Sequence, residues 1–104
     1  MQRKLTFVRD MSDHFTGKAS LYRVDPPAEY LLSEESSAMT PYVVASAPAL
    51  SMHEPRVYLF PADEQGKLLD WTEIMTWRNT ADIDVVMREW AETPSQKLAI
   101  KETT

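Results

Sequence analysis

The sequence predicts an α+β fold, in which an antiparallel β-sheet of four to five strands carries one C-terminal helix packed on one face. Short segments rich in β-branched and aromatic residues recur along most of the 104-residue chain, and one amphipathic segment follows them. Strands that come first and a helix that comes last are typical of α+β proteins, whereas a parallel sheet needs several crossover helices. The length fits a single domain over residues 1–104.

The composition is that of a globular protein, with 43% hydrophobic and 26% charged residues. The chain has no cysteine, which excludes disulfides, thiolate zinc sites and cysteine nucleophiles and suits a reducing compartment. The longest uninterrupted apolar run is four residues, as at Tyr42–Ala45, whereas a membrane span needs about 20. The N-terminus also lacks the apolar region of a secretory signal. We therefore expect a soluble, cytoplasmic protein with no membrane partner.

The charges are unevenly distributed along the chain, whose net charge is −5. Residues 1–23 hold five basic and two acidic groups, which gives +3, and residues 24–104 hold six basic and fourteen acidic groups, which gives −8. Nucleic-acid binding requires Lys and Arg to displace counterions from phosphates, so an acidic body makes a nucleic-acid partner unexpected. The basic N-terminus is either an anchoring arm or a strand with solvated charges.

The first two strands are predicted at Lys4–Arg9 and Ala19–Asp25, with a loop at Ser12–Lys18 between them. The second segment alternates, so that Leu21 and Tyr22 face opposite sides. Pro26-Pro27 is expected to end this strand, because proline cannot donate to a sheet ladder.

The middle of the chain is less regular. Residues 28–32 form either a helical turn or a short strand, and "SEESSAMTP" (residues 33–41) is expected to be an exposed loop whose serines are either solvated or phosphorylated. Tyr42–Ala47 reads as a strand ended by Pro48, and Arg56–Phe60 reads as the next strand, closed by Pro61.

The acidic stretch "PADEQGKLLD" raises the question of a calcium site. If Gly66 stood at the sixth position of an EF-hand loop, Pro61 and Thr72 would take the first and last ligand positions, and neither suits calcium. A hairpin explains the stretch better: Asp63 and Glu64 suit a turn, and Gly66 supplies a positive φ. We therefore expect strands at residues 56–60 and 67–70, with no metal and no cofactor.

The helix is predicted within Asn79–Glu92. Asn79 or Thr80 provides the N-cap, and two aspartates lie in the first turn, where the helix dipole favours anions. One apolar stripe has helical spacing and comprises Ile83, Val86, Met87 and Trp90. Thr93-Pro94 ends the helix, and the tail either adds a short strand at Lys97–Ile100 or frays over residues 97–104.

The other two tryptophans flank a short segment. Asp70–Glu73 resembles a capping box, which predicts a helical turn in which Trp71 packs on Ile74 and Met75. Trp77 and Arg78 are residue types enriched at interface hot spots, although Trp77 also suits a peripheral core position.

Catalytic signatures are missing from the sequence. The only glycines, Gly17 and Gly66, cannot form a phosphate-binding loop, a dinucleotide fingerprint or a nucleophile elbow. The only histidines, His14 and His53, have no zinc-binding spacing. We therefore predict no catalytic residue.

Three motifs carry a resemblance to a known family: "LYRVDPP" (residues 21–27), "YVVASA" (residues 42–47) and "YLFPADEQGKLLDW" (residues 58–71). Together they resemble a family of small uncharacterised proteins from bacteriophages and actinobacteria, and they cover about half of the chain. "EYLLSEESSAMT" (residues 29–40) looks like an insertion relative to that family. The resemblance implies a phage origin and assigns no activity.

The leading interpretation is a small non-enzymatic protein-binding module, encoded by a phage and acting on a host or virion protein. The expected contact residues are Asp63, Glu64, Trp71, Trp77 and Arg78. Two alternatives stay open, an acidic inhibitor or DNA mimic that occupies a nucleic-acid-binding protein, and a small metal-dependent hydrolase. The hydrolase would use Asp63, Asp70 and His53. The oligomeric state is not predicted.

Overall fold

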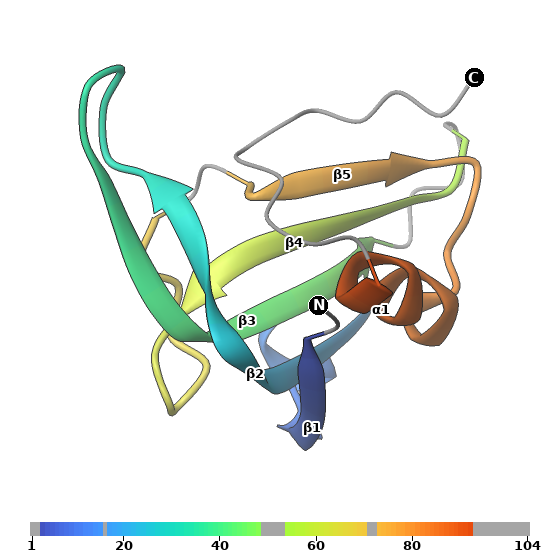
Figure 1. The fold of residues 1–104 in the computed structure, drawn as a ribbon. Helices are drawn as coiled ribbons and strands as arrows, with labels where there is room; N and C mark the ends of the chain where they lie inside the picture. Colours follow the sequence, from blue (N-terminus) through green and yellow to red (C-terminus); the bar gives the residue numbers. More distant parts are fainter. Residues whose placement is uncertain (1–2, 16, 49–53, 71–72, 93–104) are drawn as a thin grey trace.

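The computed structural model describes residues 3–15, 17–48, 54–70 and 73–92. These residues form a five-stranded antiparallel sheet and one helix, which confirms the predicted α+β class (Figure 1). The strands lie in the sheet in their sequence order, so each strand pairs with the next one along the chain. The elements are β1 (Lys4–Asp10), the 3₁₀ turn η1 (Ser12–His14), β2 (Gly17–Leu31), β3 (Ser37–Pro48), β4 (Arg56–Ala62), β5 (Met75–Arg78) and α1 (Ile83–Glu92).

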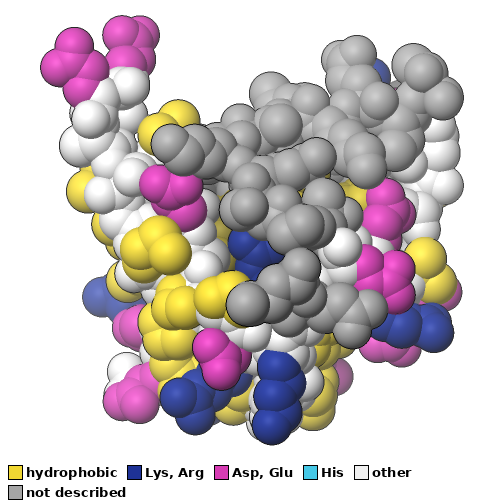
Figure 2. Space-filling view, in the orientation of Figure 1, with side chains coloured by type: hydrophobic (Ala, Val, Ile, Leu, Met, Phe, Trp, Pro, Cys, Tyr) yellow, Lys and Arg dark blue, Asp and Glu magenta, His cyan; other side chains and the backbone are white. Residues whose placement is uncertain are grey.

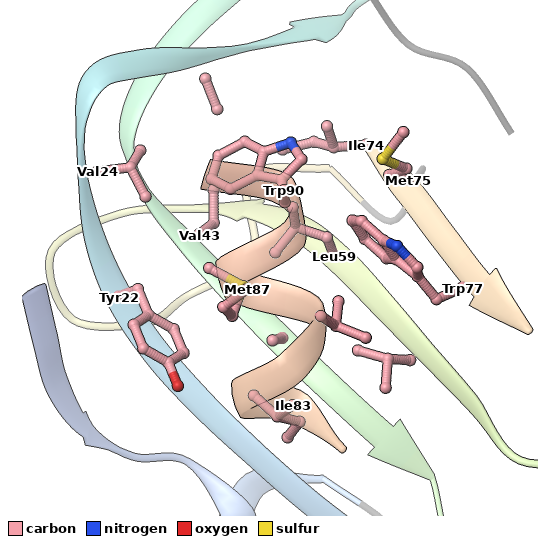
Figure 3. Packing of buried hydrophobic residues seen from close by; sticks show 14 of the residues in the cluster. Tyr22, Val24, Val43, Leu59, Ile74, Met75, Trp77, Ile83, Met87 and Trp90 are labelled. Atoms are coloured by element: carbon pink, nitrogen blue, oxygen red, sulfur yellow. The ribbon is translucent and has the colours of Figure 1, made fainter. Parts of the chain in front are cut away.

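The larger core lies between α1 and one face of the sheet (Figure 3). The predicted helical stripe is confirmed, because all four of its members are buried. Trp90 and Met87 pack toward Leu59 of β4, which is fully buried, and toward Val43 of β3. Close packing on this scale is the main source of stability for a domain of this size.

The opposite face of the sheet carries a smaller core, covered by η1 and by the turn after β4. Its buried residues are Met11, Ala19, Leu21, Val44 and Ala62. Gly66 of that turn lies against Met11, and a Cβ at Gly66 would meet the Met11 Cε at 2.5 Å. Gly66 also has the positive φ that the sequence predicts, 87°.

The helix begins later than its predicted caps. Asp82 is the N-cap, since its Oδ1 accepts a hydrogen bond from the backbone N–H of Val85 at 3.2 Å. Thr80 instead accepts from the N–H of Asp82, and Asn79 lies in the left-handed region with φ of 66°. The prediction of Asn79 or Thr80 as N-cap was therefore wrong by two or three residues.

Strand β2 continues beyond the two prolines that were expected to end it. The pairing of β1 stops at Asp25, and the register with β3 shifts between Arg23 and Ala28. Pro26 and Pro27 therefore lie where no neighbouring strand needs their missing N–H groups. The Asp25–Pro26 peptide bond is cis. As a result, residues predicted as an exposed loop, Ser37–Pro41, belong to β3.

The segment after β4 also differs from the prediction. Asp63 and Lys67 close a tight turn through a backbone hydrogen bond of 2.9 Å, and only an isolated bridge from Ala62 to Leu68 follows. The predicted strand at residues 67–70 does not form. The true partner of β4 is β5, whose first residue, Met75, was expected to lie on a helical turn. The free edge of β4 offers pairing at four positions, which overrides the local capping signal.

Within the described ranges, no helix is both long enough and apolar enough to cross a membrane. The predicted strand at residues 97–100 and the predicted tail at residues 97–104 lie outside the described residues.

Candidate functional site

The hairpin of β2 and β3 extends past the rest of the sheet as a two-stranded arm (Figure 1). Ala28–Leu31 pairs with Ser37–Thr40, and five residues at the tip join the two strands. Pairing with β1 ends at Asp25, and pairing with β4 begins at Tyr42, so neither outer strand flanks this part. We call residues 28–40 the arm.

One set of arm side chains anchors it to the body. Ala28 and Tyr30 are buried in the larger core, and Ala38 packs against it. The Thr40 hydroxyl donates a 2.7 Å hydrogen bond to the backbone carbonyl of Ala62. An isolated two-stranded hairpin is marginally stable in water, so this anchoring holds the arm in place.

The remaining arm side chains are exposed, except that of Glu29, which is partly buried. Leu31 is 39% exposed, Leu32 is 57% exposed and Met39 is 59% exposed. These are three of the seven large apolar side chains that are exposed in the described part of the chain. The others lie in pairs or singly, so the arm carries the densest group. Exposed apolar groups gathered on one element are typical of interaction surfaces.

The arm is also uniformly acidic. No Lys or Arg occurs between Arg23 and Arg56, and the arm itself holds Glu29, Glu34 and Glu35. Glu29 accepts a 2.8 Å hydrogen bond from the Ser37 hydroxyl, whereas both glutamates of the tip are exposed. Figure 2 shows acidic side chains (magenta) at the end of a projection, with hydrophobic side chains lower on the same side. A partner for this surface would combine basic and apolar groups.

The structure corrects one predicted contact residue. Trp77 is only 3% exposed and belongs to the larger core, so it is not a surface contact (Figure 3). It lies near Met75 of the same strand, and the alternative of a peripheral core position fits this placement. Trp71 lies outside the described residues.

The other predicted contacts do not form one site. The Asp63 carboxylate accepts hydrogen bonds of 2.9 Å from the N–H groups of Gln65 and Lys67, so it shapes the turn. Glu64 is exposed beside it. Arg78 pairs with Arg56 at the opposite end of β4 from this turn. At 3.3 Å per residue, Arg78 is therefore roughly 20 Å from Asp63 and Glu64.

Arg78 also lies 3.7 Å from the Glu54 carboxylate, which in turn is 3.3 Å from Arg56. Both arginines and Glu54 are partly exposed, and ion pairs of this kind contribute little to stability.

A polar hollow of about 660 Å³ lies where the start of β2 meets the N-terminus of α1. Its lining includes Asp10, Lys18 and Asp84. Hydrogen bonds from Ser12 lower the pKa of the Asp10 carboxyl, and nearby Lys18 lowers it further. Beside the hollow, burial raises the pKa of Tyr22, and the adjacent Asp84 carboxylate raises it further.

The residues proposed for a metal-dependent hydrolase are not assembled by the described structure. His53 lies outside it, and Asp63 is engaged in its turn. Among the described residues, no three His, Asp or Glu side chains form a group that could hold a metal ion.

Comparisons with known proteins do not assign the chain to a family. No protein-family model matches this chain, and no curated protein or solved structure matches it. The resemblance to phage and actinobacterial proteins therefore stays a prediction.

Sequence reasoning missed the arm itself. Its two halves, "AEYL" and "SAMT", alternate in burial but not in residue polarity, and a glutamate pair stands midway between them. Because Pro26-Pro27 is expected to end the preceding strand and residues 33–41 show no periodic apolar pattern, the sequence predicts a loop here and not one hairpin.

Proposed function

We propose that the protein is a small non-enzymatic protein-binding module and that the arm is its contact surface. The observation that carries this proposal is the pattern of exposure on the arm. Tyr30 is buried at 8% exposure, whereas its neighbour Leu31 and Met39, which stands opposite Glu29 on the paired strand, are exposed. Apolar side chains held in place but left in water favour association, because covering them removes apolar surface from water.

The architecture of the arm also supports the proposal. The hydrogen bond from Thr40 to Ala62 and the burial of Ala28 fix the arm before a partner arrives. A preformed contact surface loses less conformational entropy on binding than a flexible loop does. The tip glutamates add selectivity, since they would repel acidic surfaces and favour basic ones.

The test is affinity capture from a lysate of the source organism with matched variants. Leu32→Ser with Met39→Ser removes apolar surface from the arm. Leu69→Ser with Val85→Ser removes two comparably exposed apolar side chains from outside the arm. We expect the unmodified chain and the control variant to capture the same protein. The arm variant should fail to capture it. Equal recovery with all three chains, or recovery with none, would contradict the proposal.

The narrower parts of this hypothesis stay predictions. A phage origin, a host or virion partner and a cytoplasmic location rest on the sequence alone. The acidic-inhibitor alternative shares the arm's charge, and it predicts that a basic nucleic-acid-binding protein is captured in a salt-sensitive manner.

A further inference from the structure

We propose that the arm binds a second copy of this chain, at a basic surface around β1, so that copies join head to tail. This inference rests on the proposed function and names its partner. The basic surface consists of Lys4, Val8, Arg9 and Arg23.

The basic surface is built by the alternation of two paired strands. Leu5 of β1 packs against the larger core, so its neighbour Lys4 points to the opposite face. Arg23 of β2 stands opposite Thr6, and Arg9 stands opposite Leu21, which belongs to the smaller core. All three basic side chains therefore lie on the face of the sheet away from α1.

One exposed apolar side chain, Val8, accompanies these charges at the sheet edge. Phe7 is 58% exposed but lies on the α1 side of the sheet, where its ring edge contacts the ring of Tyr22 with centroids 5.8 Å apart, so it is not part of the basic surface. Val8 is 40% exposed. Together the basic surface and the arm hold four of the seven large apolar side chains exposed in the described ranges, namely Val8, Leu31, Leu32 and Met39. One contact between the two surfaces would cover most of this exposed apolar material.

The charges of the two surfaces are opposite in sign, although Asp25 stands opposite Lys4 in the strand register and the Arg9 guanidinium donates to the backbone carbonyl of Glu64 at 3.5 Å. Lys4, Arg9 and Arg23 are exposed on one surface, and Glu34 and Glu35 are exposed on the other. Within the part of the chain that the structure describes, none of these five side chains forms an ion pair. Opposite charges on two surfaces steer and align their encounter.

One copy cannot join its own two surfaces. Arg9 stands opposite Leu21, ten positions before Leu31 at the end of β2, and the tip glutamates lie beyond that end. Figure 2 shows basic side chains (dark blue) along the lower edge, where Figure 1 places β1, and acidic side chains at the far end of the arm. Two different surfaces at separate places give a heterologous contact, which produces rings or open chains of copies.

The contact is made by side chains rather than by strand addition. The register of β1 against β2 shifts between Phe7 and Arg9, so Val8 forms a bulge at the sheet edge. Bulges and edge charges oppose the pairing of one sheet edge with another. Val8 in this bulge is exposed and lies next to Arg9, so it offers an apolar contact beside a basic side chain.

The test measures mass by sedimentation velocity over a range of protein concentrations. The monomer has a mass of 11.9 kDa. At about 0.1 M salt we expect the mass to rise with concentration, and at about 1 M salt the rise should disappear, because the Debye length falls from about 10 Å to about 3 Å. A constant monomer mass at low salt would overturn the inference.

Two variants in which charged side chains are replaced by glutamine test the head-to-tail geometry. The arm variant is Glu34→Gln with Glu35→Gln, and the edge variant is Lys4→Gln with Arg23→Gln. Each alone should stay monomeric. Mixed, they should form a one-to-one complex and nothing larger, because only one intact pair of surfaces remains. Variants that each still dimerise, or a mixture that stays monomeric while the unmodified chain associates, would contradict the geometry.

A control variant, Glu64→Gln with Glu92→Gln, removes two exposed acids away from the arm and should associate as the unmodified chain does. Loss of association in this control would also count against the inference, since overall charge would then be the cause. A chain that stays monomeric but still captures a different protein through its arm would refute this inference and leave the proposed function standing.

Discussion

Strands β2 and β3 run through both the body of the sheet and the arm, yet their side chains are covered by other elements in the body and exposed in much of the arm. In the body, Val43 and Val44 of β3 are both fully buried, because α1 covers one face and η1 with the Gly66 turn covers the other. In the arm, Ala28 and Tyr30 are buried while Leu31 and Met39 are exposed.

This difference arises from neighbours rather than from residue type. Leucine occurs in both regions, fully buried at Leu59 and 57% exposed at Leu32. The body uses its apolar side chains for stability, whereas the arm leaves them available to a partner. Apolar substitutions in the two regions should therefore have opposite consequences for stability and for binding.

The largest expected effect tests this contrast directly. Leu59→Ala should lower the free energy of unfolding by about 2–5 kcal/mol, because it leaves a cavity in the core. Leu32→Ala should change it by less than about 0.5 kcal/mol, as for other exposed positions. Urea denaturation of both variants measures the difference. Similar losses at the two positions would show that the arm belongs to the cooperative core.

A second change tests how the face away from α1 is covered. Gly66→Ala should cost about 1–2 kcal/mol, because an L side chain is strained at a left-handed φ. The added methyl would also displace the Met11 side chain. Thermal and urea unfolding measure the loss. If stability is unchanged, the turn does not close on this face of the sheet as the structure indicates.

A third change tests the contact between Arg3, near the N-terminus, and the C-terminal end of α1. The Arg3 guanidinium lies 4.3 Å from the ring centroid of Trp90, and the Arg3 N–H donates to the carbonyl of Ala91. Arg3→Met keeps the backbone bond and removes the charge, which should cost about 0.5–1 kcal/mol. Arg88→Met, at an exposed position of α1, is the control and should have a smaller effect. Equal losses would mean that the ring contact contributes nothing.

The smallest expected effect concerns pH. The Tyr22 hydroxyl donates to the Asp84 carboxylate at 3.4 Å, a long hydrogen bond whose loss in Tyr22→Phe should cost about 0.5 kcal/mol. Burial and Asp84 raise the pKa of Tyr22 in the folded state, so the unfolded chain loses this proton first. The stability from this shift is fully present below about pH 10, the unfolded value, and is lost as pH rises through the folded pKa.

Urea unfolding between pH 8 and pH 11 (a range set around the usual tyrosine pKa of about 10) measures this dependence. Above pH 10 the unmodified chain should lose stability more steeply than Tyr22→Phe. The other tyrosines remain in both chains, so the difference isolates Tyr22. Identical slopes would show that the folded environment leaves the titration of Tyr22 unchanged.

Most of the body could be predicted from the sequence, because its signals are local and periodic. The helical stripe from Ile83 to Trp90 and the alternation around Tyr22 identify faces directly. The position of Met75–Arg78 could not be predicted, since it depends on the free edge of β4, which is a tertiary feature.

The candidate site was predicted less well than the fold. Trp77 was expected as a contact because of its residue type, but burial depends on which elements cover it. The arm was missed because prolines normally interrupt strands, and their tolerance depends on where the neighbouring strands end. The absence of Lys and Arg between residues 24 and 55 was the sequence signal that marked this region.

Site-specific photo-crosslinking tests the role of the arm most directly. A photoreactive residue would replace Met39 on the arm in one chain and Val85 on α1 in another, two positions that are 59% and 46% exposed. After irradiation in the source cells, Met39 should yield a discrete crosslinked protein, either a second copy or another chain, and Val85 should yield none. Crosslinks from Val85 alone, or equal yields from both positions, would contradict the assignment of the arm as the binding surface.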